Sequence, residues 1–261
     1  MAFESLYDNF IAEYYDASPV VQNRADIAFY VNAAKEFGEP VLELGCGSGR
    51  VALAVARPGF KITGLDLSPK MLAQAEEKLA KLPADARDRA NFVQGNMTNF
   101  DLGKQFRLAI IPFRPFQHLL DVQQQLACLE CVHKHLQPDG RLVLDFFQTE
   151  PRRMHDREYL NKRQIAEYEM SEGRKVRLTE RVTAFHRAEQ VNDVEMVYDV
   201  THGDGRQERL TMAFPFRYFF RYEVEHLLAR GGFEVEETFG DFDRSALHDD
   251  SPEMIFVARA L

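Results

Sequence analysis

The sequence has few cysteines and no long apolar run. The three cysteines among 261 residues, Cys46, Cys128 and Cys131, cannot all pair with one another, so we do not expect a disulfide framework. No window approaches the roughly 18 apolar residues of a membrane-spanning helix. The opening segment MAFESLYDNF carries Glu4 and Asp8 and lacks the basic and apolar regions of a secretory signal. These absences predict a cytoplasmic protein that is not a membrane protein.

Basic residues are not in excess either. The 32 Lys and Arg residues face 41 Asp and Glu residues, which gives a formal net charge of -9. Nucleic-acid-binding proteins usually carry a basic excess that displaces counterions, so we expect no nucleic-acid partner. A local basic cluster at 150–163, EPRRMHDREYLNKR, is interspersed with acids and predicts a solvated connection.

What is present is a pattern typical of an α/β protein. Short apolar runs alternate with amphipathic stretches between residues 40 and 147, as in a parallel sheet wrapped by helices. One helix follows Ser68, which can cap it, and Pro69, which suits its first turn. A second helix is indicated by apolar residues at spacings of three and four from Leu119 to Leu136, after which QPDG breaks the chain. The strands are expected at 41–45, 60–66, 91–95, 106–112 and 140–147, and the face of the first helix at Leu72, Ala75, Leu79 and Leu82.

From about 163 to 216 the composition changes, and the segments become longer and rich in Val, Thr, Tyr and Phe. HGDGRQ within this block is a hairpin signal, so the block predicts an inserted antiparallel sheet. A helix ended by Gly231 and Gly232 and two strands follow it. The predicted fold is a Rossmann-like, doubly wound, seven-stranded sheet with an antiparallel lid inserted after the fifth strand. The predicted domains are 1–39, an N-terminal helical cap; 40–150, the core; 151–219, the lid; and 220–261, the C-terminal part of the core.

The most informative stretch is VLELGCGSGR, in which an apolar strand runs into glycines at every second position. Gly45, Gly47 and Gly49 allow positive φ and leave no Cβ in the way of a ligand, and the next helix offers unpaired amides. A dinucleotide fingerprint, G-x-G-x-x-G, fits poorly because Arg50 follows Gly49. Asp66, 17 residues after Gly49, can accept hydrogen bonds from two ribose hydroxyls. The residues therefore predict a ligand that contains adenosine.

Four segments together carry a resemblance. VLELGCGSGR, GLDLSPKML, FVQGNMTNF and HLQPDGRLVLDFF occur in order across residues 41–147, and they resemble the class I S-adenosylmethionine-dependent methyltransferases. The resemblance implies that Gly45, Cys46 and Gly47 wrap the methionine portion of S-adenosylmethionine. Glu43 would orient the loop or the amino group, and Asp66 would hold the ribose. The other cofactor contacts that we expect are Tyr15, Arg24, Gly49, Leu67, Met71, Asn96, Met97 and Pro112.

Alternative interpretations of these residues stay open. The glycines could merely permit a tight turn, Asp66 could cap the next helix, and Cys46 is expected as a small apolar wall. Family members often have an aspartate where Asn96 stands, and an asparagine oxygen can accept the same adenine hydrogen bond without charge.

The acceptor side is expected in IIPFRPFQHLLD, which a doubly wound sheet places beside the cofactor. His118 is the candidate general base or orienting group, because an amine or hydroxyl acceptor has to lose a proton. The alternative is that His118 has only a structural role, with its ring hydrogen-bonded at the start of a helix. Aromatic residues here and in FPFRYFFRYE would equally suit packing. The substrate contacts that we expect are Tyr14, Arg114, Phe116, Gln117, Arg217, Tyr218 and Arg221.

The YYD start, FQHL after the fourth strand and the antiparallel insertion are similar to sugar-amine N-methyltransferases. In those relatives the insertion roofs the site and forms subunit contacts, so a homodimer through the inserted sheet is one expectation. We predict methyl transfer to a small-molecule acceptor, with an amine slightly favoured. The alternatives are an O-methyltransferase, a non-catalytic S-adenosylmethionine-binding protein and an NAD-dependent oxidoreductase, the last disfavoured by the glycine spacing.

A metal site is not expected. CLECVHKH combines Cys128, Cys131, His133 and His135 on one predicted helix. The two cysteines share a helix face while the histidines point elsewhere, so four ligands cannot converge on one ion.

Overall fold

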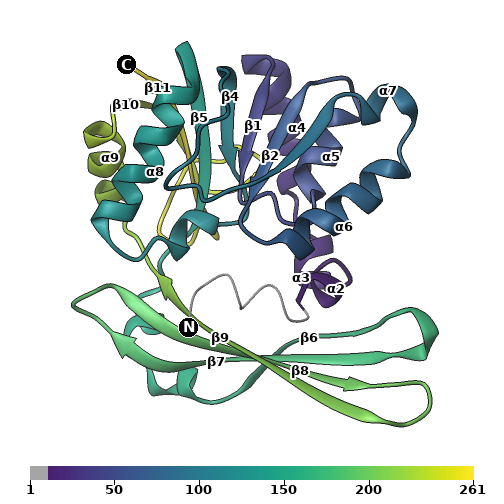
Figure 1. Cartoon of the computed structure of the whole chain (residues 1–261). Helices are drawn as coiled ribbons and strands as arrows, with labels where there is room; N and C mark the ends of the chain where they lie inside the picture. Colours follow the sequence, from purple (N-terminus) through teal and green to yellow (C-terminus); the bar gives the residue numbers. More distant parts are fainter. Residues whose placement is uncertain (1–10) are drawn as a thin grey trace. The chain divides into compact units, whose positions relative to one another are not determined.

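Figure 1 shows the computed structural model, which describes residues 11–261. The chain divides into two compact units. The insertion unit joins the described residues up to Arg24 with Thr149–Tyr218, and the core unit joins Ala25–Gln148 with Phe219–Leu261. Within the described part of the chain, no helix is long and apolar enough to cross a membrane. The four-part domain division stays a prediction.

The core unit contains a seven-stranded sheet in the order β10-β11-β5-β4-β1-β2-β3. β11 is antiparallel to β10 and β5, and the pairs from β5 to β3 are parallel. The direction of winding reverses between β1 and β4, where sheets of this kind bind ligands at the strands' carboxyl ends. The predicted seven-stranded sheet is confirmed. Its strands are β1 (Val41–Leu44), β2 (Ile62–Asp66), β3 (Ala90–Gln94), β4 (Phe106–Ile111), β5 (Leu136–Phe147), β10 (Phe233–Phe239) and β11 (Glu253–Ala260).

Helices cover both faces of this sheet, and β1 shows why. Leu42 and Leu44 belong to an apolar cluster that includes Leu129 and Val224 from two helices. Val41 belongs to a second cluster, which includes Tyr30 and Val55 from two other helices. A central parallel strand buried on both faces is therefore apolar at successive positions. The helices are α4 (Asp26–Phe37), α5 (Arg50–Ala56), α6 (Pro69–Ala80), α7 (Ala84–Arg87), α8 (Val122–His135) and α9 (Arg221–Arg230), with the 3-10 turn η1 (Pro115–His118).

The α6 prediction is confirmed in its detail. The Ser68 side chain accepts a hydrogen bond from the Met71 amide at 3.2 Å and caps the helix, and Pro69 stands in the first turn. The predicted face at Leu72, Ala75 and Leu79 is buried. Leu82 lies beyond the end of the helix.

The α8 prediction is right in kind and wrong at its ends. Asp121 caps the helix by accepting from the Gln124 amide at 2.8 Å, so Leu119 precedes the helix. Leu136 already belongs to β5, and the predicted break at QPDG is an irregularity inside that strand. Asp139 has φ 58°, and the β4–β5 register shifts at this point. The turn residues therefore interrupt the pairing without ending the strand.

The insertion unit contains a four-stranded antiparallel sheet in the order β6-β7-β8-β9, which confirms the sheet predicted after the fifth strand. The hairpin predicted at HGDGRQ joins β8 to β9, and Gly205 adopts φ 85° there. The elements are α2 (Ile11–Tyr15), α3 (Pro19–Gln22), β6 (Arg163–Glu169), β7 (Lys175–His186), β8 (Val191–Thr201) and β9 (Gln207–Arg217), with 3-10 turns η2 (Pro151–Met154), η3 (Arg157–Leu160) and η4 (Ser171–Gly173).

The two faces of this sheet differ in polarity. On one face Val176, Leu178, Tyr198 and Val200 pack with Tyr14 of α2. The other face carries ion pairs across the strands, because alternate residues of a strand point to opposite faces. These pairs are Arg177–Asp199 at 3.5 Å, Arg209–Asp199 at 2.6 Å and Arg181–Glu195 at 2.7 Å.

Candidate active site

The glycine-rich segment between β1 and α5 is a loop that requires its glycines. Gly45, Gly47 and Gly49 have φ of 67°, 52° and 76°, in the left-handed region that costs other residues strain. A Cβ on Gly45 would lie 2.6 Å from the Pro115 Cβ, and a Cβ on Gly49 would lie 2.9 Å from the Phe92 ring. The loop is therefore closely packed as well as sharply turned.

Asp66, at the end of β2, accepts hydrogen bonds that fix this loop. Its Oδ2 accepts a hydrogen bond from the Gly47 amide at 2.7 Å, and its Oδ1 accepts from the Ser68 amide at 2.9 Å. Burial raises the pKa of this carboxyl, and backbone hydrogen bonds from Ser68, Gly47 and Leu67 oppose the shift. Ser68 caps α6, so the cap interpretation of Asp66 does not hold. A carboxylate has about four lone-pair positions, so acceptor capacity remains for a further donor such as a ribose hydroxyl.

Glu43 is a buried acid beneath the loop, 2 % exposed. Burial raises its pKa to about 8, with further increases from Asp66 and Asp26 and decreases from Arg50 and the Ala52 amide. Its Oε2 has no hydrogen-bond partner in the described part of the chain. A buried polar atom without a partner is costly, so this oxygen marks the side on which a donor from a ligand would fit.

Arg50, the residue that disfavoured a dinucleotide loop, has a structural role. Its Nη1 and Nη2 donate to the two Asp26 oxygens at 2.7 and 2.6 Å. Asp26, in α4, is fully buried, and the Arg50 Cζ lies 5.6 Å from the centre of the Phe113 ring. This bidentate pair ties the start of α5 to α4.

The predicted adenine contacts lie beside the loop with one difference. Met71 and Met97 each place their Cε near a loop glycine, 3.7 Å from the Cβ position of Gly47 and 3.6 Å from that of Gly45. Leu67 is half-buried. Asn96 is exposed, and its Oδ1 accepts from the amide and the hydroxyl of Thr98, both at 2.9 Å. The oxygen expected to face adenine is therefore already used in a turn.

The segment after β4 approaches the glycine loop. Phe113 and Arg114 have φ of 63° and 69°, after which η1 begins at Pro115 and ends at His118. Pro115 packs against Gly45, so this segment contacts the glycine-rich loop at 45–49. We call this loop the cofactor loop, after the ligand that the sequence predicts for it. Pro112 is buried and His118 is half-buried.

Two predicted acceptor residues of this segment are almost completely buried. Phe116 is 1 % exposed, with its ring 5.8 Å from Phe146 and 6.0 Å from Phe219. Gln117 is also 1 % exposed, and its Oε1 accepts from the Phe147 amide at 3.1 Å. Phe116 therefore packs as a core residue. Gln117 links the post-β4 segment to the end of β5 through its hydrogen bond with Phe147.

The remaining predicted residues are spread over both units. In the insertion unit, Tyr14 is buried against Tyr198, and the Arg217 Nη1 donates to the Glu189 carbonyl at 2.8 Å. Tyr15, Arg24 and Tyr218 belong to the same unit. In the core unit, the exposed Arg221 donates to Glu225 at 2.8 Å along α9.

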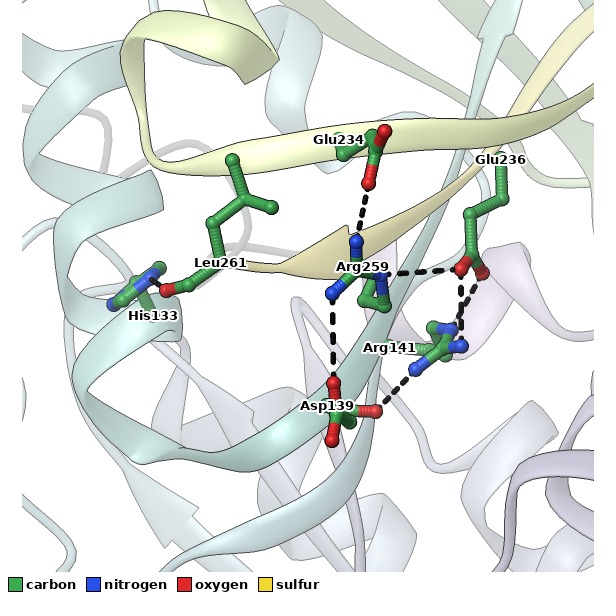
Figure 2. Close-up of polar contacts among 7 residues, drawn as sticks. All are labelled: His133, Asp139, Arg141, Glu234, Glu236, Arg259 and Leu261. Carbon is green, nitrogen blue, oxygen red and sulfur yellow. Dashed lines mark hydrogen bonds and ion pairs between the residues drawn. The ribbon is translucent and has the colours of Figure 1, made fainter.

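The two histidine side chains near the end of α8 contact other protein atoms. His135 Nε2 accepts from the Leu102 amide at 3.0 Å, and His133 Nε2 lies 3.1 Å from the Leu261 carbonyl oxygen (Figure 2). Burial raises the pKa of Cys128 well above its ordinary value. In the described residues, no three His, Cys, Asp or Glu side chains are arranged to hold a metal ion.

Sequence reasoning missed three buried polar residues near the post-β4 segment. Tyr30 and Asp145 are fully buried and Glu253 is 6 % exposed, and their contacts with Phe113 and Arg114 are described below. The available signal was a lone acid inside or at the start of an apolar strand, as in VLDFF and PEMIFV. Acids are seldom fully buried unless they are paired, so such a residue indicates a specific partner.

Comparison with known proteins gives concordant matches. A methyltransferase-domain family model matches residues 41–140. The cypemycin N-terminal methyltransferase of Streptomyces sp is 25% identical over 259 residues, which cover 98% of each chain.

Two solved structures are also similar to the chain. The CcbJ methyltransferase from Streptomyces caelestis superimposes with a TM-score of 0.77 at 25% identity, covering 98% of both chains. An amino pentose methyltransferase from Micromonospora echinaspora, with S-adenosylmethionine bound, gives a TM-score of 0.67 at 26% identity and covers 92% of this chain and 91% of that one.

Proposed function

We propose that this chain, a class I S-adenosylmethionine-dependent methyltransferase that acts on a small molecule, methylates an amine nitrogen of its acceptor. The observation that carries the nitrogen preference is the similarity to N-methyltransferases beyond the cofactor-binding region, over 98% of the chain in one relative. The amino pentose methyltransferase, similar over 92% of the chain, supports the same choice.

The loop residues suit S-adenosylmethionine, which when bound supplies an electrophilic methyl group on a sulfonium. An ammonium group is the donor that the unpartnered Glu43 Oε2 lacks, and the cofactor's methionine portion carries one. Asp66 retains acceptor capacity for a ribose hydroxyl. We assign the rest of the cofactor surface to Gly45, Cys46, Gly47, Gly49, Leu67, Met71, Met97 and Pro112. Asn96, Tyr15 and Arg24 stay predictions.

On the acceptor side, the chain has to orient an amine and remove its proton. A protonated amine has no lone pair for displacement, so a neighbouring base is required. We assign this proton to the imidazole of His118, because His118 ends the segment that contacts the cofactor loop through Pro115. Placing the two reactants in line contributes much of the rate. The substrate contacts Tyr14, Arg217, Tyr218 and Arg221 stay predictions.

The test is methyl transfer from labelled S-adenosylmethionine to matched acceptors. The panel pairs a nucleoside-diphosphate amino sugar with its hydroxyl analogue, and a short peptide that has a free N-terminus with its acetylated form. We expect label on at least one amine and none on the blocked or hydroxyl counterparts. Label only on hydroxyl compounds would favour the O-methyltransferase alternative. Binding of S-adenosylhomocysteine without transfer to any compound in this panel or in a metabolite mixture would favour the non-catalytic alternative.

Location and assembly complete the proposal. The three cysteines are free thiols, which favours the reducing cytosol. The outer strands β6 and β9 of the inserted sheet offer edges for pairing, which supports a homodimer through that sheet. Light scattering at several protein concentrations tests the dimer, and a monomer throughout would contradict it.

A further inference from the structure

A buried polar cluster lies where β4, β5 and β11 meet the post-β4 segment. Asp145 Oδ1 accepts from the Tyr30 hydroxyl at 2.5 Å and from the Phe113 amide at 2.8 Å. Arg114 Nη2 donates to Glu253 Oε1, and its Nε lies 3.9 Å from Asp145 Oδ2. All four charged or hydroxyl side chains are at least nine-tenths buried. We call Tyr30, Arg114, Asp145 and Glu253 the buried lock.

The lock holds a turn that the chain would not adopt alone. Phe113 and Arg114 are consecutive non-glycine residues with φ of 63° and 69°. Such a conformation is strained and persists only where the surroundings fix it. Here the Phe113 amide is fixed by Asp145 and the Arg114 guanidinium by Glu253. The guanidinium also lies 3.3 Å from the centre of the Phe147 ring.

This turn sets the position of the rest of the post-β4 segment. It places Pro115 against Gly45 of the cofactor loop. Two residues further on, Gln117 is fixed by the Phe147 amide, which belongs to the same end of β5 as Asp145. His118 follows directly, so its backbone position depends on a turn whose contacts come from the lock.

We propose that Tyr30, Asp145 and Glu253 are positioning residues, which act through Phe113 and Arg114 to place His118 and the acceptor segment against the cofactor. The inference rests on the proposed function only for its kinetic consequence. It also gives Arg114 a different role from the substrate contact expected from the sequence, since its guanidinium is engaged by Glu253 and Phe147.

The test compares Glu253→Gln and Asp145→Asn with Glu234→Gln, an exposed acid paired with Arg259 on β11 and remote from the loop. Each protein is saturated with S-adenosylhomocysteine, and the histidine ring signals are recorded by NMR. The spectrum of His118→Asn identifies the His118 signal. Calorimetry gives the affinity for S-adenosylhomocysteine, and thermal melting reports folding.

We expect both lock variants to shift or double the His118 signal while the cofactor affinity changes less than about threefold. With the amine acceptor, kcat per folded enzyme falls about 10- to 100-fold, as a misplacement of about 1 Å can cause. Glu253→Asp, which keeps the charge, restores part of the rate. The control variant Glu234→Gln leaves all three readouts unchanged.

An unchanged His118 signal and unchanged kcat in folded Glu253→Gln and Asp145→Asn would overturn the proposal, even if both proteins melt earlier. If Asp145→Asn does not fold, Glu253→Gln alone decides. The NMR readout needs no acceptor, so a wrong proposed function and a wrong positioning role give different results.

Discussion

Two charged clusters lie at opposite ends of β5 and β11, and each includes residues of neighbouring elements. At one end is an exposed ladder of Asp139, Arg141, Glu234, Glu236 and Arg259 (Figure 2). At the other end is the buried lock. The register of β11 with β5 shows that the two clusters are separated along the strands. Arg259 is opposite Arg141, whereas Glu253 is opposite Phe147.

The ladder gives each arginine solvent-exposed acidic partners. Arg141 Nε donates to Glu236 at 2.6 Å, and Arg259 lies 3.4 Å from both Glu236 and Asp139. The register shift between Val235 and Glu237 leaves Glu236 as the extra residue of the bulge. Exposed pairs of this kind contribute about 0–1 kcal/mol each to stability. The ladder therefore suits surface pairing across three strands.

The lock contains the same kinds of groups in a setting where each partner matters. Removal of one member leaves a buried charge or donor without a partner, which costs about 3–5 kcal/mol. Such a cluster is a poor way to gain stability alone, since apolar packing would serve as well. The comparison indicates that burial, and not the number of ion pairs, distinguishes a cluster that positions the reacting segment.

The sharpest test of this comparison is Asp145→Ala. The change removes the acceptor of both the Tyr30 hydroxyl and the Phe113 amide and leaves the Arg114 charge with one acidic partner fewer. We expect the free energy of unfolding to fall by about 3–5 kcal/mol in urea titrations. Glu234→Ala in the ladder is the control, with an expected loss below about 1 kcal/mol. Equal losses at the two sites would remove the distinction.

His118→Asn tests whether the lock serves catalysis. An asparagine keeps a polar side chain and cannot take the acceptor's proton at neutral pH. We expect kcat to fall about 100-fold with the affinity for S-adenosylhomocysteine nearly unchanged, because general bases contribute at least that much. Steady-state kinetics with the amine acceptor and calorimetry are the measurements. A turnover rate that stays at the wild-type value across pH would leave His118 as a packing residue.

Asp66→Ala extends the comparison to the cofactor loop. Loss of an acceptor for charged or hydroxyl donors costs about 1.5–3 kcal/mol, so we expect about 10- to 150-fold weaker binding of S-adenosylhomocysteine by calorimetry. The exposed Asp85→Ala, on α7, is the control for loss of an acid. Unaltered binding in a folded Asp66→Ala protein would contradict the ribose assignment.

The burial of Glu43 predicts that stability depends on pH. Burial raises its pKa from 4.5 to about 8, so the folded protein keeps a proton that the unfolded chain has lost between these values. Stability of the cofactor-free protein should therefore fall as pH rises through this window. Glu43→Gln should flatten the dependence, as measured by urea titrations of the variant and the wild-type protein at pH 5 and 8. A slope that Glu43→Gln leaves intact would assign the effect to another group.

Much of the core was predictable because local signals determine it. Ser68 and Pro69 mark the start of α6, and the glycines at 45, 47 and 49 mark a turn that the φ angles require. The antiparallel sheet followed from strand-forming residues and a glycine-containing hairpin. The hydrophobic periodicity, the helix caps and the turn-forming residues each involve only a few neighbouring residues. They can therefore be recognised in a single sequence.

The lock was not predictable because its members come from four distant parts of the chain. Tyr30 and Asp145 are 115 residues apart, and Arg114 and Glu253 are 139 apart. The sequence indicates that an acid in VLDFF needs a partner but does not identify it. The same limit applies to Asn96, whose side-chain oxygen bonds with Thr98. The pairing of polar groups depends on tertiary contacts that a local pattern does not specify.

The smallest expected effect is that of Glu236→Gln in the ladder. The variant keeps the side-chain shape and removes the charge that faces both Arg141 and Arg259. Because these side chains are 21 to 31 % exposed, we expect a loss below about 1 kcal/mol at low salt, and a smaller loss at 1 M salt where charges are screened within about 3 Å. Urea titrations at the two salt concentrations measure it, with Glu253→Gln as the buried counterpart whose loss should persist at 1 M. A loss at Glu236 that is as large and as insensitive to salt as the loss at Glu253 would show that the ladder is coupled to the core.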